Sequence, residues 1–185
     1  MDACLLVPAA ADLPGTRWRA VGEAVGPDPA AADPGAWAGL AGLPADDDVV
    51  DTASSPHFLL APHRLVHGIA AVLRTPEGAE RARTALAGAD FARHLGLGLA
   101  ADLGLGSPDT EVLAVDVEPS DVGHRVVFTG AGPAGVVPVH LDVVALGAGR
   151  GVGVVWFADA PAPFPVEDRD HVLVRLARRV GGGCD

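Results

Sequence analysis

The chain has 185 residues and a mass of 18.6 kDa, which fits one domain and leaves little room for a second. Apolar residues make up 49% and charged residues 20% of the sequence, so disorder over the whole chain is excluded. The net charge of −11 disfavours nucleic acid or an anionic membrane as a partner, and no apolar run is long enough to span a membrane.

The first part of the chain, residues 1–47, is rich in Pro, Ala, Gly and Asp. Prolines interrupt this segment repeatedly, and each one removes an N–H donor and favours extended geometry in the residue before it. We expect an extended arm with one or two helical turns that packs on the following domain through Trp18 and Trp37. A disordered arm is the alternative.

A single domain is expected over residues 48–181, followed by a tail over 182–185. Its first firm element is a strand over 63–75, rich in β-branched residues, with a shorter strand before it near 48–51. Thr75 is a good N-cap and Pro76 suits the first helical position, which predicts that a helix begins there. Gly96 and Gly98 are expected to end or kink this helix.

The second half of the sequence has a different texture, with four β-rich runs separated by short Gly-rich turns. Short connections favour antiparallel neighbours, so these runs predict a meander. A closing helix with an apolar stripe is expected over 167–180. The order predicts an α+β fold, in which two helices cover one face of a curved antiparallel sheet. This sheet would comprise the four-stranded C-terminal meander, at 111–117, 124–129, 136–146 and 152–159, plus one or two N-terminal strands.

Three stretches of this core are similar to a known family: the helix TPEGAERARTAL, the hairpin HLDVVALGAGRGVGVVWF and the closing helix DHVLVRLARRV. With them, residues 63–180 resemble the extracytoplasmic sensor domain of actinobacterial serine/threonine kinases of the PknH type and related stand-alone lipoproteins. The resemblance implies an α+β domain with a cleft, a ligand-binding role and no enzymatic activity. Two features depart from the family, because this core has no Cys and no signal peptide is visible in the sequence.

The two cysteines, Cys4 and Cys184, lie near opposite ends of the chain. A disulfide between them would close a very long loop and would stabilise the fold by several kcal/mol in the chain-entropy model. Two separate thiols are the alternative, since spacing alone does not show that the residues meet. The absence of a CxxC motif excludes a zinc ribbon and a thioredoxin-like redox site.

His63 and His67 have the i, i+4 spacing of a helical zinc site. On the strand predicted here, however, they would lie about 13 Å apart and could not hold one metal ion. HRLVH also lacks the glutamate of a zinc protease motif. We therefore expect no metal site and no cofactor.

His140 and Asp142 are the most suggestive polar pair, because they are two residues apart on a predicted strand and therefore share one face. The first interpretation is a polar lining of a ligand-holding sheet face. The second is the solvated side of a half-covered sheet. Under the first interpretation, the candidate ligand-binding residues are His124, Arg125, His140, Asp142 and Trp156.

The chain contains no Lys, Asn, Gln or Tyr, which indicates a GC-rich source genome and excludes Schiff-base lysines and tyrosine acids. Because no catalytic set is evident, the leading hypothesis is a non-enzymatic, sensor-like domain that binds a small molecule or a protein in a cleft between sheet and helix. One alternative is a small enzyme or biosynthetic accessory protein that uses His140 and Asp142 as base and orienter. Another is an interaction module that forms a homodimer.

The compartment depends on whether Met1 is the native start of the protein. A native Met1 would indicate a cytoplasmic protein, because the first residues lack a basic region and a sufficient apolar stretch. If Met1 replaces a removed leader, the protein belongs in the cell envelope or is secreted.

Overall fold

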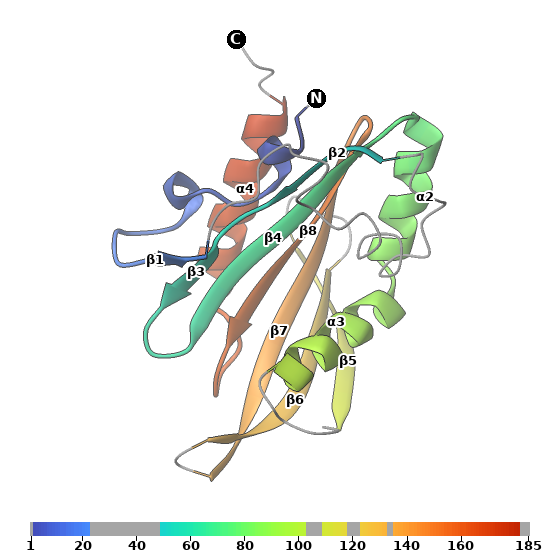
Figure 1. Cartoon of the computed structure of the whole chain (residues 1–185). Coiled ribbons are helices and arrows are strands. Elements are labelled where there is room, and N and C mark those ends of the chain that lie inside the picture. The colour runs from blue at the N-terminus through green and yellow to red at the C-terminus, as the bar shows by residue number, and fades with distance from the viewer. Residues whose placement is uncertain (1, 23–48, 103–108, 118–122, 133–134, 182–185) are drawn as a thin grey trace.

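The structure, a computed structural model, describes residues 2–22, 49–102, 109–117, 123–132 and 135–181. Within these residues, an open antiparallel sheet of eight strands forms the centre (Figure 1). The strand order is β1-β3-β4-β8-β7-β6-β5, and β2 pairs with β4 beside β3. The strands are β1 (Arg19–Val21), β2 (Val49–Ser54), β3 (His57–Leu60), β4 (Arg64–Leu73), β5 (Thr110–Val115), β6 (Gly123–Gly132), β7 (Gly135–Ala148) and β8 (Gly151–Asp159).

The α+β fold with a curved antiparallel sheet is confirmed, and the C-terminal meander follows as β5-β6-β7-β8. The N-terminal half contributes four strands, however, where one or two were expected. Ser55 and Pro56 divide one edge of the sheet into β2 and β3, and both pieces pair with β4. The short strand β1 then pairs with β3, so the sheet extends further than the β-branched pattern indicates.

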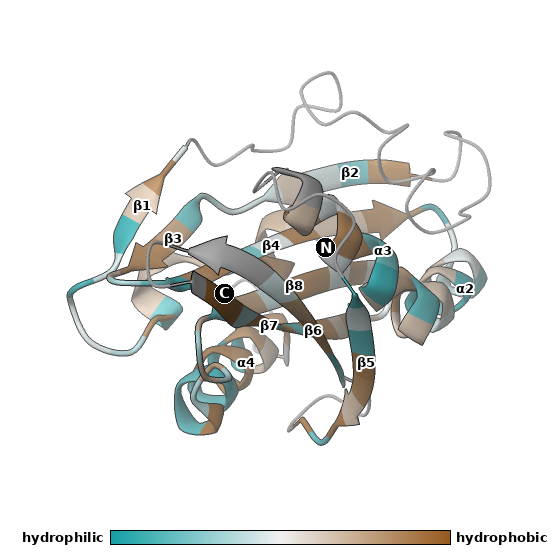
Figure 2. Cartoon of the chain, turned by 90° about the horizontal axis from the view of Figure 1, so that it is seen from below, coloured by the Kyte–Doolittle hydropathy of each residue, from teal (hydrophilic) through white to brown (hydrophobic). Residues whose placement is uncertain are grey.

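The helices lie on both faces of the sheet, which corrects the expectation that they cover one (Figure 1). Val143 packs with helices α2 (Pro76–Leu86) and α3 (Ala89–Asp102), whereas its neighbour Val144 packs with α4 (Val166–Gly181). Neighbouring residues of a strand point to opposite faces. The apolar colouring that runs along the central strands in Figure 2 therefore includes residues of both faces, so each face needs a cover. We call the two sides the α3 face and the α4 face.

Helix α2 begins as predicted, because the Gly78 amide donates to the Thr75 hydroxyl oxygen at 3.1 Å and Pro76 occupies the first helical position. It ends at Leu86, and α3 then continues through both Gly96 and Gly98, which corrects the expectation that these glycines end or kink the helix. Gly96 allows a close approach to the sheet. A Cβ atom at Gly96 would lie 2.7 Å from a methyl carbon of the buried Val126.

These two glycines are expected to respond to alanine in opposite directions. Gly98→Ala should raise the free energy of unfolding by about 0.5–1 kcal/mol, because alanine favours the helix and no atom lies within 4 Å of the new methyl group. Gly96→Ala should lower it by about 1–3 kcal/mol, because the methyl group overpacks against Val126. Urea unfolding of both variants measures the difference, and stabilisation of both would contradict the close packing of α3.

The described part of the N-terminal segment, residues 2–22, contacts the α4 side of the domain. Two short 3-10 helices, η1 (Ala3–Leu6) and η2 (Ala10–Asp12), precede β1, and Leu6 is buried in a cluster with strands β2 and β4. The Arg179 side chain of α4 donates to the Val7 carbonyl oxygen at 2.6 Å. Trp18 stacks on Phe164 with 6.3 Å between ring centroids, whereas Trp37 lies outside the described residues.

Candidate functional site

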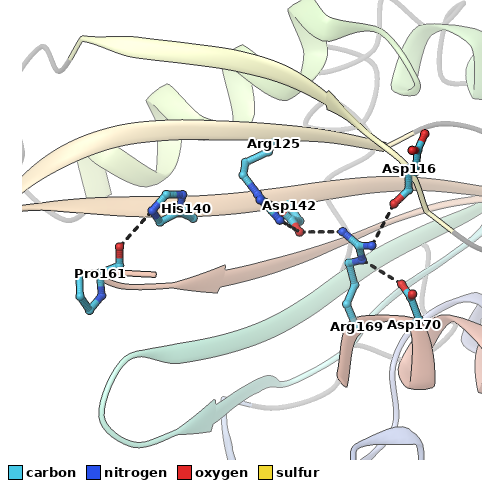
Figure 3. A network of polar contacts seen from close by, with 7 residues as sticks. All are labelled: Asp116, Arg125, His140, Asp142, Pro161, Arg169 and Asp170. Carbon is cyan, nitrogen blue, oxygen red and sulfur yellow. Dashed lines mark hydrogen bonds and ion pairs between the residues drawn. The ribbon is translucent and has the colours of Figure 1, made fainter. Parts of the chain in front are cut away.

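The Asp142 carboxylate is fully buried on the α4 face, where two arginines bind it (Figure 3). Arg125 on β6 donates to both carboxylate oxygens, from Nε at 2.5 Å and from a terminal nitrogen at 2.8 Å. These hydrogen bonds raise the pKa of Arg125. Asp142 and Arg125 meet because they are directly opposite each other in the β6–β7 pairing.

Arg169 of α4 is the second partner of Asp142 and joins three parts of the fold (Figure 3). Its side chain is only 2% exposed and donates to the Asp142 carboxylate at 3.0 Å. It also donates to the Asp116 carbonyl oxygen at 3.0 Å and to the Asp170 carboxylate at 3.1 Å. We call Arg125, Asp142 and Arg169 the buried triad. The triad connects α4 to the sheet through hydrogen bonds, and the two arginines already donate to both oxygens of the Asp142 carboxylate.

The five predicted ligand-binding residues do not form one cluster. Arg125, His140 and Asp142 lie on the α4 face, where His140 Nε2 is 3.0 Å from the Pro161 carbonyl oxygen (Figure 3). His124 and Trp156 both pair with Val143, so they point to the α3 face. The sheet therefore separates the predicted residues into two groups.

A cavity of about 600 Å³ lies on the α3 face, beside the turn between β3 and β4. Leu65 of β4, Ala158 of β8 and Val139 of β7 contribute to it from the sheet, and Leu99 of α3 from the helix. Further lining residues are Leu59, Leu60, Ala61, Pro62 and Ala160. These side chains are all apolar, so the described body of the cavity offers contact area and no side-chain hydrogen bonds.

Among the described residues, the polar ones that line the cavity are all basic: Arg17, Arg19, His63 and Arg64. The Arg64 guanidinium is turned to the α4 side, where it pairs with Asp159 at 2.8 Å and with Asp168 at 3.2 Å. Arg17 and Arg19 are exposed, and neither forms an ion pair within the part of the chain that the structure describes. Among the described residues, the cavity therefore has an apolar body and two guanidinium groups without an acidic partner.

Next to the cavity, the α3 face carries an aromatic cluster that contains no predicted site residue except Trp156. The buried His67 ring stacks on His57 with 4.1 Å between centroids and makes a T-shaped contact with Trp156, with 4.5 Å between centroids. The Ser54 hydroxyl oxygen lies 3.5 Å from His67 Nε2. Burial, followed by the charge of His57, lowers the pKa of His67 from 6.5 to about 4. His67 is therefore neutral near pH 7.

Other predicted features are described in part. Cys4 has no disulfide partner among the described residues, burial raises the pKa of its thiol, and Cys184 lies outside them. Within the described ranges, no group of three or more His, Cys, Asp or Glu residues is arranged to hold a metal ion. No helix in those ranges is both long and apolar enough to cross a membrane.

Sequence reasoning missed the cavity residues of the N-terminal segment, although a local signal was present. Arg17, Trp18 and Arg19 alternate between polar and apolar residues, and β1 begins at the last of them. Such alternation is typical of a strand with one face on a core. The Pro-rich composition around this stretch obscured the signal. No family model and no curated protein matches the chain.

Proposed function

We propose that this protein is a non-enzymatic, sensor-like domain that binds a small molecule in the cavity between the sheet and α3. The cavity itself carries the proposal. Its volume of about 600 Å³ lies within the range of roughly 300–1,000 Å³ of small-molecule sites. An apolar lining with a few polar groups at one side is also typical of such sites. The resemblance of the sequence to extracytoplasmic sensor domains suggests the same role.

The chemistry of the lining favours binding over catalysis. The described lining residues include no carboxylate, hydroxyl or thiol that could act as a nucleophile or as a partner for His63. The alternative pair, His140 and Asp142, lies on the other face of the sheet. Both Asp142 oxygens already accept hydrogen bonds from arginines, and His140 interacts with the Pro161 carbonyl.

Ligand-dependent thermal stability tests this proposal. A ligand at 100 times its Kd should stabilise the folded protein by about 2.7 kcal/mol and raise Tm by roughly 5–10 °C. The screen would use fatty acids, acyl esters, glycan fragments and small anions. Leu65→Trp places a large side chain in the cavity and should abolish the shift, while Leu97→Trp on the exposed side of α3 should retain it. An equal shift in both variants would place binding outside the cavity.

A further inference from the structure

We infer that the ligand of this cavity is an anion with an apolar body, such as a long-chain carboxylate, a phosphate monoester or a sulfonate. In this arrangement Arg17 and Arg19 bind the acidic group, and the apolar part lies along Leu65, Val139 and Leu99. The inference rests on the proposed function and names the class of ligand that the same cavity takes.

The backbone pairing of β1 explains why the two arginines face the cavity. Arg19 pairs with Leu59, which pairs in turn with the cavity residue Leu65 on β4. Side chains directly opposite each other in an antiparallel sheet lie on one face. Trp18, between the arginines, points the other way and stacks on Phe164 of the α4 side. The contact of Trp18 thus holds Arg17 and Arg19 on the cavity side.

The charge of the cavity is opposite to that of the chain. The chain carries 24 acidic and 13 basic residues, yet the described residues of the lining include three arginines and no acidic residue. Asp159 and Asp168 pair with Arg64, whereas Arg17 and Arg19 have no acidic partner among the residues that the structure describes, so their guanidinium groups are the ones that we assign to the ligand. Guanidinium groups bind carboxylates, phosphates and sulfonates through paired, charge-assisted hydrogen bonds. In a protein of net charge −11, these two groups favour an anion at this site over the rest of the surface.

The remainder of the lining excludes a polar ligand body. Leu59, Leu65, Val139 and Ala158 lie on the sheet side, and Leu99 lies on the helix side. A sugar or a nucleotide base placed here would lose hydrogen bonds to water and would find no side-chain partner among these residues. A hydrocarbon or aromatic body gains from the same burial. The two halves of the site together select an amphiphilic anion.

Two fluorescent probes that share the same aromatic skeleton test the inference. 1-Anilinonaphthalene-8-sulfonate and N-phenyl-1-naphthylamine differ only in the sulfonate group, so their relative affinity isolates the charge. At low ionic strength and pH 7.5, we expect the sulfonate to bind about tenfold more tightly or better. Hexadecanoate should displace it more effectively than hexadecanol. Added salt should weaken binding of the sulfonate and leave the neutral probe unchanged.

Matched variants assign the effect to the two arginines. Arg17→Gln combined with Arg19→Gln should remove the preference for the sulfonate and preserve binding of the neutral probe. Arg81→Gln combined with Arg178→Gln changes net charge equally on exposed helical surfaces and should leave the preference intact. Leu65→Trp should abolish binding of both probes, and so should Val139→Trp. Either variant can be used if the other does not fold.

The outcomes separate this inference from the proposed function. If both probes bind equally well in the cavity, the ligand class is wrong and the binding function stands. If the sulfonate preference survives the loss of Arg17 and Arg19, the anion is bound elsewhere and the inference is overturned. If neither probe binds, nor any compound of the thermal screen, the proposed function fails as well.

Discussion

Replacing Asp142 by asparagine is expected to lower the free energy of unfolding by about 3–5 kcal/mol, the largest effect of any single substitution considered for this protein. Asp142 is completely buried and its partner Arg169 is 2% exposed, so the substitution removes the buried counter-charge of this guanidinium and leaves it only the more exposed Asp170 carboxylate. The new amide group also brings N–H donors against the N–H donors of the arginines. Urea or guanidinium unfolding at constant m-value measures the loss.

A double variant distinguishes loss of the ion pairs from loss of packing. Asp142→Leu combined with Arg169→Met removes the two most buried charges of the triad and leaves Arg125, which is 18% exposed. This double variant should be about 1–2 kcal/mol more stable than the sum of the single effects predicts. Glu80→Gln serves as the control, because its pair with Arg83 is exposed and should contribute less than about 1 kcal/mol. Strict additivity of the two single effects would contradict the buried triad.

The second large effect is a loss of stability in mild acid that depends on His67. Burial and the neighbouring His57 lower the pKa of this side chain to about 4 in the folded protein, against an ordinary value of 6.5 in the unfolded chain, so between these values the unfolded chain binds the proton more readily. His67 therefore stabilises the fold above pH 6.5, and this contribution is lost as the pH falls toward 4. The loss between pH 7 and pH 5 is expected to be about 2 kcal/mol.

Chemical unfolding at a series of pH values measures how the free energy of unfolding depends on pH in the wild-type protein and in His67→Phe. The window from pH 7 to pH 5 lies above the ordinary pKa of carboxylates, so histidines dominate the slope. His67→Phe should flatten the slope whatever its stability at pH 7, and His171→Gln, at an exposed position of α4, should retain it. A slope that His67→Phe leaves unchanged would show that His67 is not buried as a neutral ring.

The sequence predicted most of the regular elements because their signals are local. The Thr75–Pro76 start of α2, the meander and the closing helix all depend on capping, turn and periodicity patterns over short windows. The second helical layer was missed for a physical reason. Val143 and Val144 are adjacent and both apolar, and such a run indicates that both faces of the strand are buried. The interpretation of the His140 and Asp142 face as solvated did not take this run into account.

The functional site was harder to predict than the fold. The face shared by His140 and Asp142 followed from strand alternation, but their surroundings depend on Arg125 and on Arg169, which is 27 residues further along the chain from Asp142. The cavity joins Arg17 and Arg19 to strands and a helix much later in the sequence. Pairings of this kind depend on strand order, which local patterns do not determine. The kinase-sensor resemblance and the homodimer stay predictions.

The edge contact between Trp156 and His67 gives the protein an intrinsic optical reporter. An imidazolium group quenches the emission of a neighbouring indole more strongly than a neutral imidazole does. Trp156 also lies on β8 two residues before the cavity residue Ala158, on the same face of the strand. Its emission should therefore respond both to the protonation of His67 and to occupancy of the adjoining space, without any label attached to the protein.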